Sequence, residues 1–204
     1  MQFSENIAAM VRSARSTFLR TDLASPQIFA ANMLFLHDLV IASERLLKEA
    51  LVETARKPRD AFIARLEDYM EKHLEEETGH LSWLISDMHG AGISPTPLPD
   101  PLAMALVGTQ YYLLKHQHPA SLLGYMASLE SDPIPLDTVD ALEELHGAQS
   151  TKFIREHATK DLKHRKTLAQ IIDETPECLR GLIWHSADSS LRYYGVAVAS
   201  WGNA

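Results

Sequence analysis

The sequence contains a single cysteine, Cys178, among its 204 residues. One thiol excludes an internal disulfide and any zinc-finger or iron–sulfur framework. No segment approaches the roughly 18 consecutive apolar residues of a membrane-spanning helix. Residues 1–15 also lack the apolar stretch of a signal peptide. We therefore expect a cytoplasmic protein that does not act at a membrane.

Basic residues are few and scattered. The chain has 19 Lys and Arg against 27 Asp and Glu, which gives a formal net charge of −8. A protein that binds nucleic acid normally carries a basic face, and this sequence has no run rich in Lys and Arg outside one short stretch, residues 160–166. We therefore expect no nucleic-acid partner. The expected partner is a small-molecule substrate.

Glycine and proline are also sparse, with 9 and 10 copies, and they lie between segments rather than within them. Alternating runs of Val, Ile and Thr, which are typical of strands, are nearly absent. Ser25-Pro26 and Asp100-Pro101 are typical helix starts. The pattern predicts one all-α domain, residues 1–204, of seven or eight helices. Beyond the N-terminal region, the expected helices cover about 25–51, 58–90, 101–118, 119–131, 137–146, 149–173 and 175–201.

Ionisable residues interrupt the apolar face of the helix predicted over 58–90. That face runs from Phe62 to Met88, and its spacing of three and four residues passes through His73, Glu77 and His80. A buried, unpaired carboxylate costs several kcal/mol, so such groups must be paired, hydrogen-bonded or bound to metal.

The helix predicted over 149–173 repeats this feature. His157, Asp161 and His164 form the pattern His-x3-Asp-x2-His on one face, between Phe153 and Leu168. Surface helices rarely place three such residues in a row on an otherwise apolar face. We interpret the row as a set of candidate metal ligands.

Glu130 is a third case, because it ends the apolar face of the segment 119–131. Three carboxylates and three imidazoles suit two transition-metal ions in a helix bundle, with iron, manganese or zinc as the metal. Glu76 competes with Glu77, since it lies one residue away from the same face. His73 is either a hydrogen-bond partner of a ligand or a half-buried histidine. The candidate metal ligands and catalytic residues are Glu77, His80, Glu130, His157, Asp161 and His164.

Four segments carry a resemblance to a known family. Residues 76–80, Glu-Glu-Thr-Gly-His, are followed by Trp83 and Asp87. Residues 107–112, 118–130 and 157–164 resemble the middle and last parts of the same pattern. Together they resemble the heme-oxygenase-like iron-containing redox enzymes, also called heme-oxygenase-like diiron oxidases and oxygenases. The resemblance covers about residues 60–190.

The resemblance implies a heme-oxygenase-like helical bundle, expected as a homodimer, that holds two Fe2+ ions, or manganese in their place. Glu77, His80 and His157 would hold one iron, while Glu130, Asp161 and His164 would hold the other. The implied reaction uses O2 as co-substrate, with electrons from the two ferrous ions or an external donor. It would oxidise a small amine, amino acid or fatty acid by N-oxygenation, desaturation or C–C cleavage. Residues 1–55 would shape the substrate pocket.

Two other classes of function stay open. The first is a member of the same fold that works without metal or binds heme. For the heme-binding alternative, His37 is the candidate axial ligand on an apolar helix. The second is a metal-binding or iron-handling helical protein without oxygenase activity.

Overall fold

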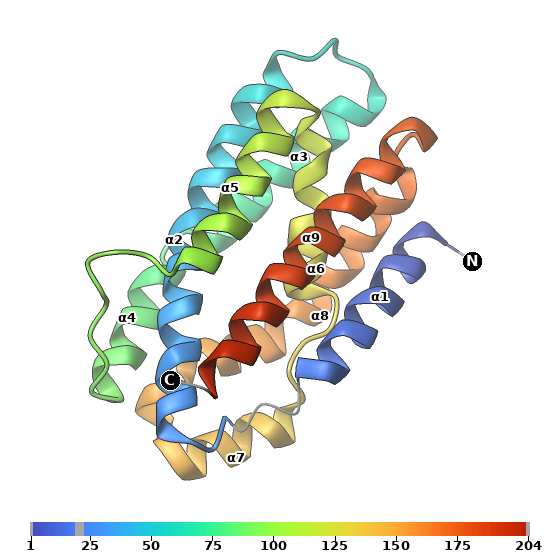
Figure 1. Cartoon of the computed structure of the whole chain (residues 1–204). Helices are drawn as coiled ribbons and strands as arrows, with labels where there is room; N and C mark the ends of the chain where they lie inside the picture. Colours follow the sequence, from blue (N-terminus) through green and yellow to red (C-terminus); the bar gives the residue numbers. More distant parts are fainter. Residues whose placement is uncertain (1, 19–22, 203–204) are drawn as a thin grey trace.

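The computed structural model describes residues 2–18 and 23–202, apart from the side chains of residues 17–18 and 160–163. The described chain is all-α, as predicted, but it contains nine α-helices where the sequence predicts seven or eight (Figure 1). Two short 3-10 helices lie between them. The elements are α1 (Phe3–Phe18), α2 (Pro26–Ala55), α3 (Ala61–Glu77), α4 (His80–Gly90), α5 (Pro101–His116), η1 (Pro119–Ser121), α6 (Leu122–Glu130), α7 (Leu136–His146), η2 (Ala148–Ser150), α8 (Lys152–Glu174) and α9 (Glu177–Trp201).

The additional helix arises because the segment predicted as one helix over 58–90 is two helices. Chain direction changes at Thr78, which is extended, and at Gly79, which has a φ of 97°. Left-handed backbone of this kind favours glycine, because a Cβ would meet the following carbonyl oxygen. The spacing of three and four residues between apolar positions continues across Thr78 and Gly79. Helical periodicity in the sequence therefore does not reveal the break. The first of the two helices begins after Asp60, whose carboxylate accepts a 2.8 Å hydrogen bond from the Ile63 amide.

The main core lies where α2, α5, α6 and α9 run side by side (Figure 1). Leu46, Leu106, Leu123 and Ile183 come from these four helices, and each has no exposed surface. Gly124 lets α6 and α9 approach closely, since a Cβ at this position would lie 2.1 Å from the Ile183 carbonyl oxygen. This close contact fixes the position of α6, which ends at Glu130.

A second, smaller core joins α4 to α8 and to the beginning of α2. Phe29, Leu84 and Phe153 are among its buried residues. Asp87 is 2% exposed, and its carboxylate accepts a 2.6 Å hydrogen bond from the Phe153 amide in the first turn of α8. This bond sets where α8 begins relative to α4. None of the helices in the described ranges is long and apolar enough to cross a membrane.

Candidate metal centre

Glu77, His80 and His157 form one group of candidate metal ligands. Their ligand atoms all lie within 4.8 Å of one another. Glu77 is the last residue of α3 and His80 the first of α4, so the Glu-x-x-His pair spans the break between the helices. A distance of 3.1 Å separates the Glu77 Oε2 and His80 Nδ1 atoms. His157 comes from α8, and its ring centroid lies 4.8 Å from that of His80.

The His157 ring is oriented by a hydrogen bond to its own helix. Its Nδ1–H donates to the Phe153 carbonyl oxygen, with a separation of 2.8 Å. A carbonyl can only accept, so Nδ1 carries the proton and Nε2 of the neutral ring keeps a free lone pair. Burial lowers the pKa of His157, and the bond to the Phe153 carbonyl offsets only part of this effect. The neutral form that binds a metal is therefore favoured.

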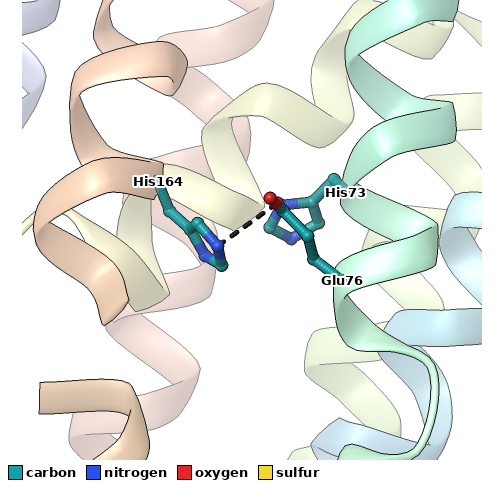
Figure 2. A group of neighbouring side chains, drawn as sticks. All are labelled: His73, Glu76 and His164. Carbon is teal, nitrogen blue, oxygen red and sulfur yellow. Dashed lines mark ion pairs between the residues drawn. The ribbon is translucent and has the colours of Figure 1, made fainter. Parts of the chain in front are cut away.

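His73, Glu76 and His164 form a second group, drawn in Figure 2, whose ligand atoms also lie within 4.8 Å of one another. The Glu76 Oε2 atom on α3 lies 3.2 Å from the His164 Nε2 atom on α8. His73 is buried, whereas the Glu76 side chain is 41% exposed. This group therefore lies between the interior and the surface.

Glu130 lies beside the second group and close to the first. Its Oε1 atom is 3.1 Å from the His73 Nε2 atom, which is 3.9 Å from Glu77 Oε1. Burial lowers the pKa of His73, but the Glu130 carboxylate and the neighbouring glutamates raise it more, to about 9. The Glu130 Oε2 atom is buried and has no hydrogen-bond partner among the described residues. A buried carboxylate oxygen without a partner fits a site that takes a cation.

The donor set also fits iron or manganese. Carboxylate oxygens and imidazole nitrogens favour these metals, and no thiolate lies among the described ligand atoms. Five of the six residues proposed from the sequence have described side chains, and these five lie in or beside the two groups. The sixth, Asp161, is in α8 between His157 and His164, but its side chain lies outside the described residues.

The two neighbouring glutamates join different groups. Sequence reasoning weighs Glu76 only as a substitute for Glu77, whereas the structure places Glu77 with His80 and Glu76 with His164. Successive residues of an α-helix point about 100° apart, so one helix end can offer carboxylates in two directions. His73, interpreted above as a ligand's neighbour or a half-buried histidine, lies between both glutamates and Glu130.

A cavity of about 420 Å³ adjoins these groups. Its wall includes Glu77 and His157 of the first group, His73 of the second group, and Glu130, and most of the remaining wall is apolar. One face of α2, which includes Leu36, Leu39 and Leu47, lines it. His37 lies on α2 beside Asp38, at 3.3 Å, and is not part of the wall formed by the described residues.

Comparisons with known proteins agree with this architecture. A domain of unknown function with a heme oxygenase-like fold from Shewanella denitrificans is 17% identical, with a TM-score of 0.73, over 98% of this chain and 90% of that chain. A TenA homolog from Pseudomonas syringae pv. tomato is 12% identical, with a TM-score of 0.77, over 99% and 93%. A CADD-like protein of unknown function from Nostoc punctiforme is 14% identical, with a TM-score of 0.69, over 98% and 93%. Identities this low establish the heme oxygenase-like fold alone.

A search of curated proteins found no match. The family comparison, by contrast, matches residues 43–195, a span that contains both groups of candidate ligands and Glu130. A match over most of the chain establishes membership. The chain belongs to the iron-containing redox enzyme family.

Proposed function

We propose that this protein is a non-heme diiron oxidase or oxygenase that uses O2 to oxidise a small organic substrate. The observation that carries the proposal is the pair of carboxylate–imidazole groups beside a large apolar cavity, whose wall includes His73, Glu77 and His157 of these groups. Family membership supports iron as the metal. Two ferrous ions, when bound, would supply electrons for the reduction of dioxygen.

The candidate ligands form two sets, one for each iron. Glu77, His80 and His157 would hold one iron, with His157 fixed by its bond to the Phe153 carbonyl. His164 and Glu130 would hold the other, together with Asp161 as the sequence predicts. Glu130 could also reach towards the first group, because its partner His73 lies near Glu77.

Two sets of side chains are available as ligands for the second iron. His73 and Glu76 lie with His164, so they are alternative ligands to Glu130 and Asp161 for the second iron. Without metal, the His73 ring is protonated at neutral pH because its pKa is raised to about 9. Binding of a cation beside Glu130 would replace this positive charge, and a proton would leave His73.

The cavity would exclude water from the reacting part of the substrate. Its apolar wall favours a substrate with a substantial hydrocarbon portion, and the reaction classes are N-oxygenation, desaturation or C–C cleavage. An external electron donor would complete the cycle if more than one turnover is catalysed.

The test is anaerobic reconstitution with Fe2+, followed by metal analysis and O2 uptake. We expect about two irons per chain, and O2 consumption that depends on them. Glu77→Gln should reduce both, whereas the matched control Glu75→Gln, on an exposed side chain two residues earlier, should not. His157→Ala should act like Glu77→Gln, with the exposed His89→Ala as its control. Asp161→Ala should abolish O2 uptake while the protein stays folded; unchanged uptake in this variant would refute the role of that residue.

The second candidate function is iron handling without oxygenase chemistry. It is favoured by the exposure of Glu76, which brings one group of candidate ligands to the surface, where metal could exchange. Full iron loading without O2 consumption, together with rapid loss of iron to a chelator, would support this function over the first.

A further inference from the structure

The last turn of α6 carries Glu130 and needs hydrogen-bond partners from elsewhere in the fold. Glu130 is the final residue of this helix, and the Ser131 amide donates to the Ala127 carbonyl oxygen at 3.0 Å. The last four carbonyl groups of an α-helix have no amide partner within the regular helix, and those of Ser128 and Leu129 belong to this turn. Ser128, Glu130 and Ser131 are buried, so unpaired carbonyl groups here would destabilise the fold.

Arg15 of α1 supplies these partners. Its Nη2 donates to the Leu129 carbonyl oxygen at 2.6 Å and to that of Ser128 at 3.4 Å. Its Nη1 donates to the carbonyl oxygen of Asp132. The three acceptors lie on both sides of Glu130 in the chain, and a planar guanidinium can bind them from one fixed position. Its positive charge also opposes the partial negative charge at a helix C-terminus.

The Glu130 carboxylate has little else to fix it. Its Oε1 atom lies 3.1 Å from the His73 Nε2 atom, whereas Oε2 has no hydrogen-bond partner among the described residues. Gly124, where α6 packs closely on α9, lies more than a turn earlier in the helix. The backbone of the last turn therefore largely determines where this carboxylate lies.

The helix that carries Arg15 is itself held at its other end. Both the amide and the hydroxyl of Ser4 donate to the Asp173 carboxylate of α8, at 2.9 and 2.8 Å. At 1.5 Å per residue, Ser4 and Arg15 are about 16 Å apart along α1. This helix lies against both α6 and α8, and α8 supplies an imidazole to each group of candidate ligands (Figure 1). All of α1 precedes residues 43–195, the part of the chain that matches the family.

We infer that Arg15 is a positioning residue for Glu130. It fixes the last turn of α6 and so holds the Glu130 carboxylate beside the second group of candidate ligands. The three hydrogen bonds of its guanidinium go to main-chain oxygens, so it acts through the backbone of α6. The role of Glu130 as a metal ligand rests on the proposed function, but the effect of Arg15 on the last turn does not require metal.

The first measurement is amide hydrogen exchange by NMR in the metal-free protein. The Ser131 amide reports on the last turn, because it bonds to the Ala127 carbonyl. Arg15→Met removes every donor and keeps an unbranched side chain, so Ser131 should exchange about tenfold faster or more, the usual effect of losing a hydrogen bond to a charged group. Ser4→Ala is the matched control, since it removes the hydroxyl contact at the other end of α1 and should leave Ser131 exchange nearly unchanged.

The second measurement is anaerobic titration with Fe2+ by calorimetry. In Arg15→Met the affinity for the second equivalent should fall by about tenfold or more, the usual effect of losing a residue that orients a metal ligand. The affinity for the first equivalent should stay nearly unchanged. Arg15→Lys keeps the charge but not the planar guanidinium, so its second-equivalent affinity should lie between those of Arg15→Met and the wild type. Ser4→Ala should match the wild type.

A double-mutant cycle separates the positioning of Glu130 from a general loss of stability. Glu130→Gln should itself weaken binding of the second Fe2+. If Arg15 acts through Glu130, Arg15→Met should have little further effect in the Glu130→Gln protein. A purely structural role would lower the affinity by the same factor in both backgrounds.

Additive effects in this cycle would overturn the inference, as would unchanged Ser131 exchange in Arg15→Met or equal effects of Ser4→Ala and Arg15→Met. Where Arg15→Met does not fold, Arg15→Lys takes its place, and second-equivalent affinity equal to that of the wild type would overturn the inference. Failure of the proposed function looks different. A wild-type protein that binds two Fe2+ without O2 uptake would refute the oxygenase proposal, while the effect of Arg15 on the second Fe2+ would remain. A wild-type protein that binds fewer than two would overturn both.

Discussion

Replacing Gly79 by alanine tests how the break between α3 and α4 positions the metal ligands. Gly79 has a φ of 97°, and a Cβ built there would meet no atom within 4 Å. The cost of the substitution therefore comes from the backbone and not from a clash with a neighbour. A left-handed conformation costs an L-residue about 1–2 kcal/mol, so Gly79→Ala should lower the free energy of unfolding by that amount.

Gly181→Ala is the matched control. Gly181 is an exposed residue inside α9, and a Cβ there also meets nothing within 4 Å. Its φ is not positive, so alanine should stabilise the helix by up to about 1 kcal/mol. The same substitution should therefore lower the free energy of unfolding at Gly79 and raise it at Gly181.

Urea unfolding of the metal-free proteins measures both effects, with unchanged m-values as evidence that the unfolded surface is comparable. For a chain of this size each kcal/mol shifts the melting temperature by about 2–4 °C. Gly79→Ala should also bind less Fe2+, because Glu77 and His80 flank the break. If Gly79→Ala were as stable as the wild type, or if it lost stability but kept full iron binding, the proposed link between the break and the metal centre would be refuted.

Three further changes have expected outcomes. Asp87→Ala removes the carboxylate that accepts from the Phe153 amide; it should cost about 1–3 kcal/mol in urea unfolding and should weaken Fe2+ binding, whereas a purely local role would leave iron content unchanged. Gly124→Ala should destabilise the protein strongly, by about 3 kcal/mol or more, because the new Cβ would overlap the Ile183 carbonyl; a small loss would show that α6 and α9 can separate. Burial lowers the pKa of His118 from 6.5 to about 4, so the unfolded chain binds the extra proton in this range and stability falls as pH drops from 6.5 towards 4. His118→Asn should remove about 1 kcal/mol of this loss, a value reduced for partial exposure, and equal pH profiles of the two proteins would contradict the assignment.

Local sequence features predict most of the helices. Asp100 caps α5 as expected, since its carboxylate accepts from the amides of Leu102 and Ala103. Ser25 precedes Pro26 at the start of α2, but its hydroxyl bonds to the Gln27 side chain and not to a backbone amide. In both cases the proline fixes the first turn, so the helix begins where predicted whether or not the cap bond forms.

The break at Gly79 shows where periodicity fails. Helical spacing records which residues share a face, and a short interruption that returns to the same phase leaves the spacing intact. The Thr-Gly pair at 78–79 was the available signal, because glycine near a helix end favours the left-handed conformation. The apolar pattern on both sides concealed it.

Which residues belong to which of the two ligand groups depends on tertiary structure. Each candidate carboxylate could be found from its own helix, because a charged residue on an apolar face requires a partner. Which imidazole faces Glu76 and which faces Glu77 depends on how α8 crosses the end of α3, and that crossing is set by contacts such as Asp87 with Phe153.

The cavity's polar residues were beyond sequence reasoning for a related reason. Asn32 is one uncharged residue on a mostly apolar helix, and Arg15 lies near the end of another helix, where a cation is ordinary. Neither residue interrupts an apolar helix face in the way that the candidate metal ligands do. The fold brings both residues to the wall of one cavity, and this position depends on how α1 and α2 pack against the other helices. Candidate metal ligands can therefore be found on single helices, because each interrupts an apolar face, whereas the residues that line a cavity are identified only once the helices are packed together.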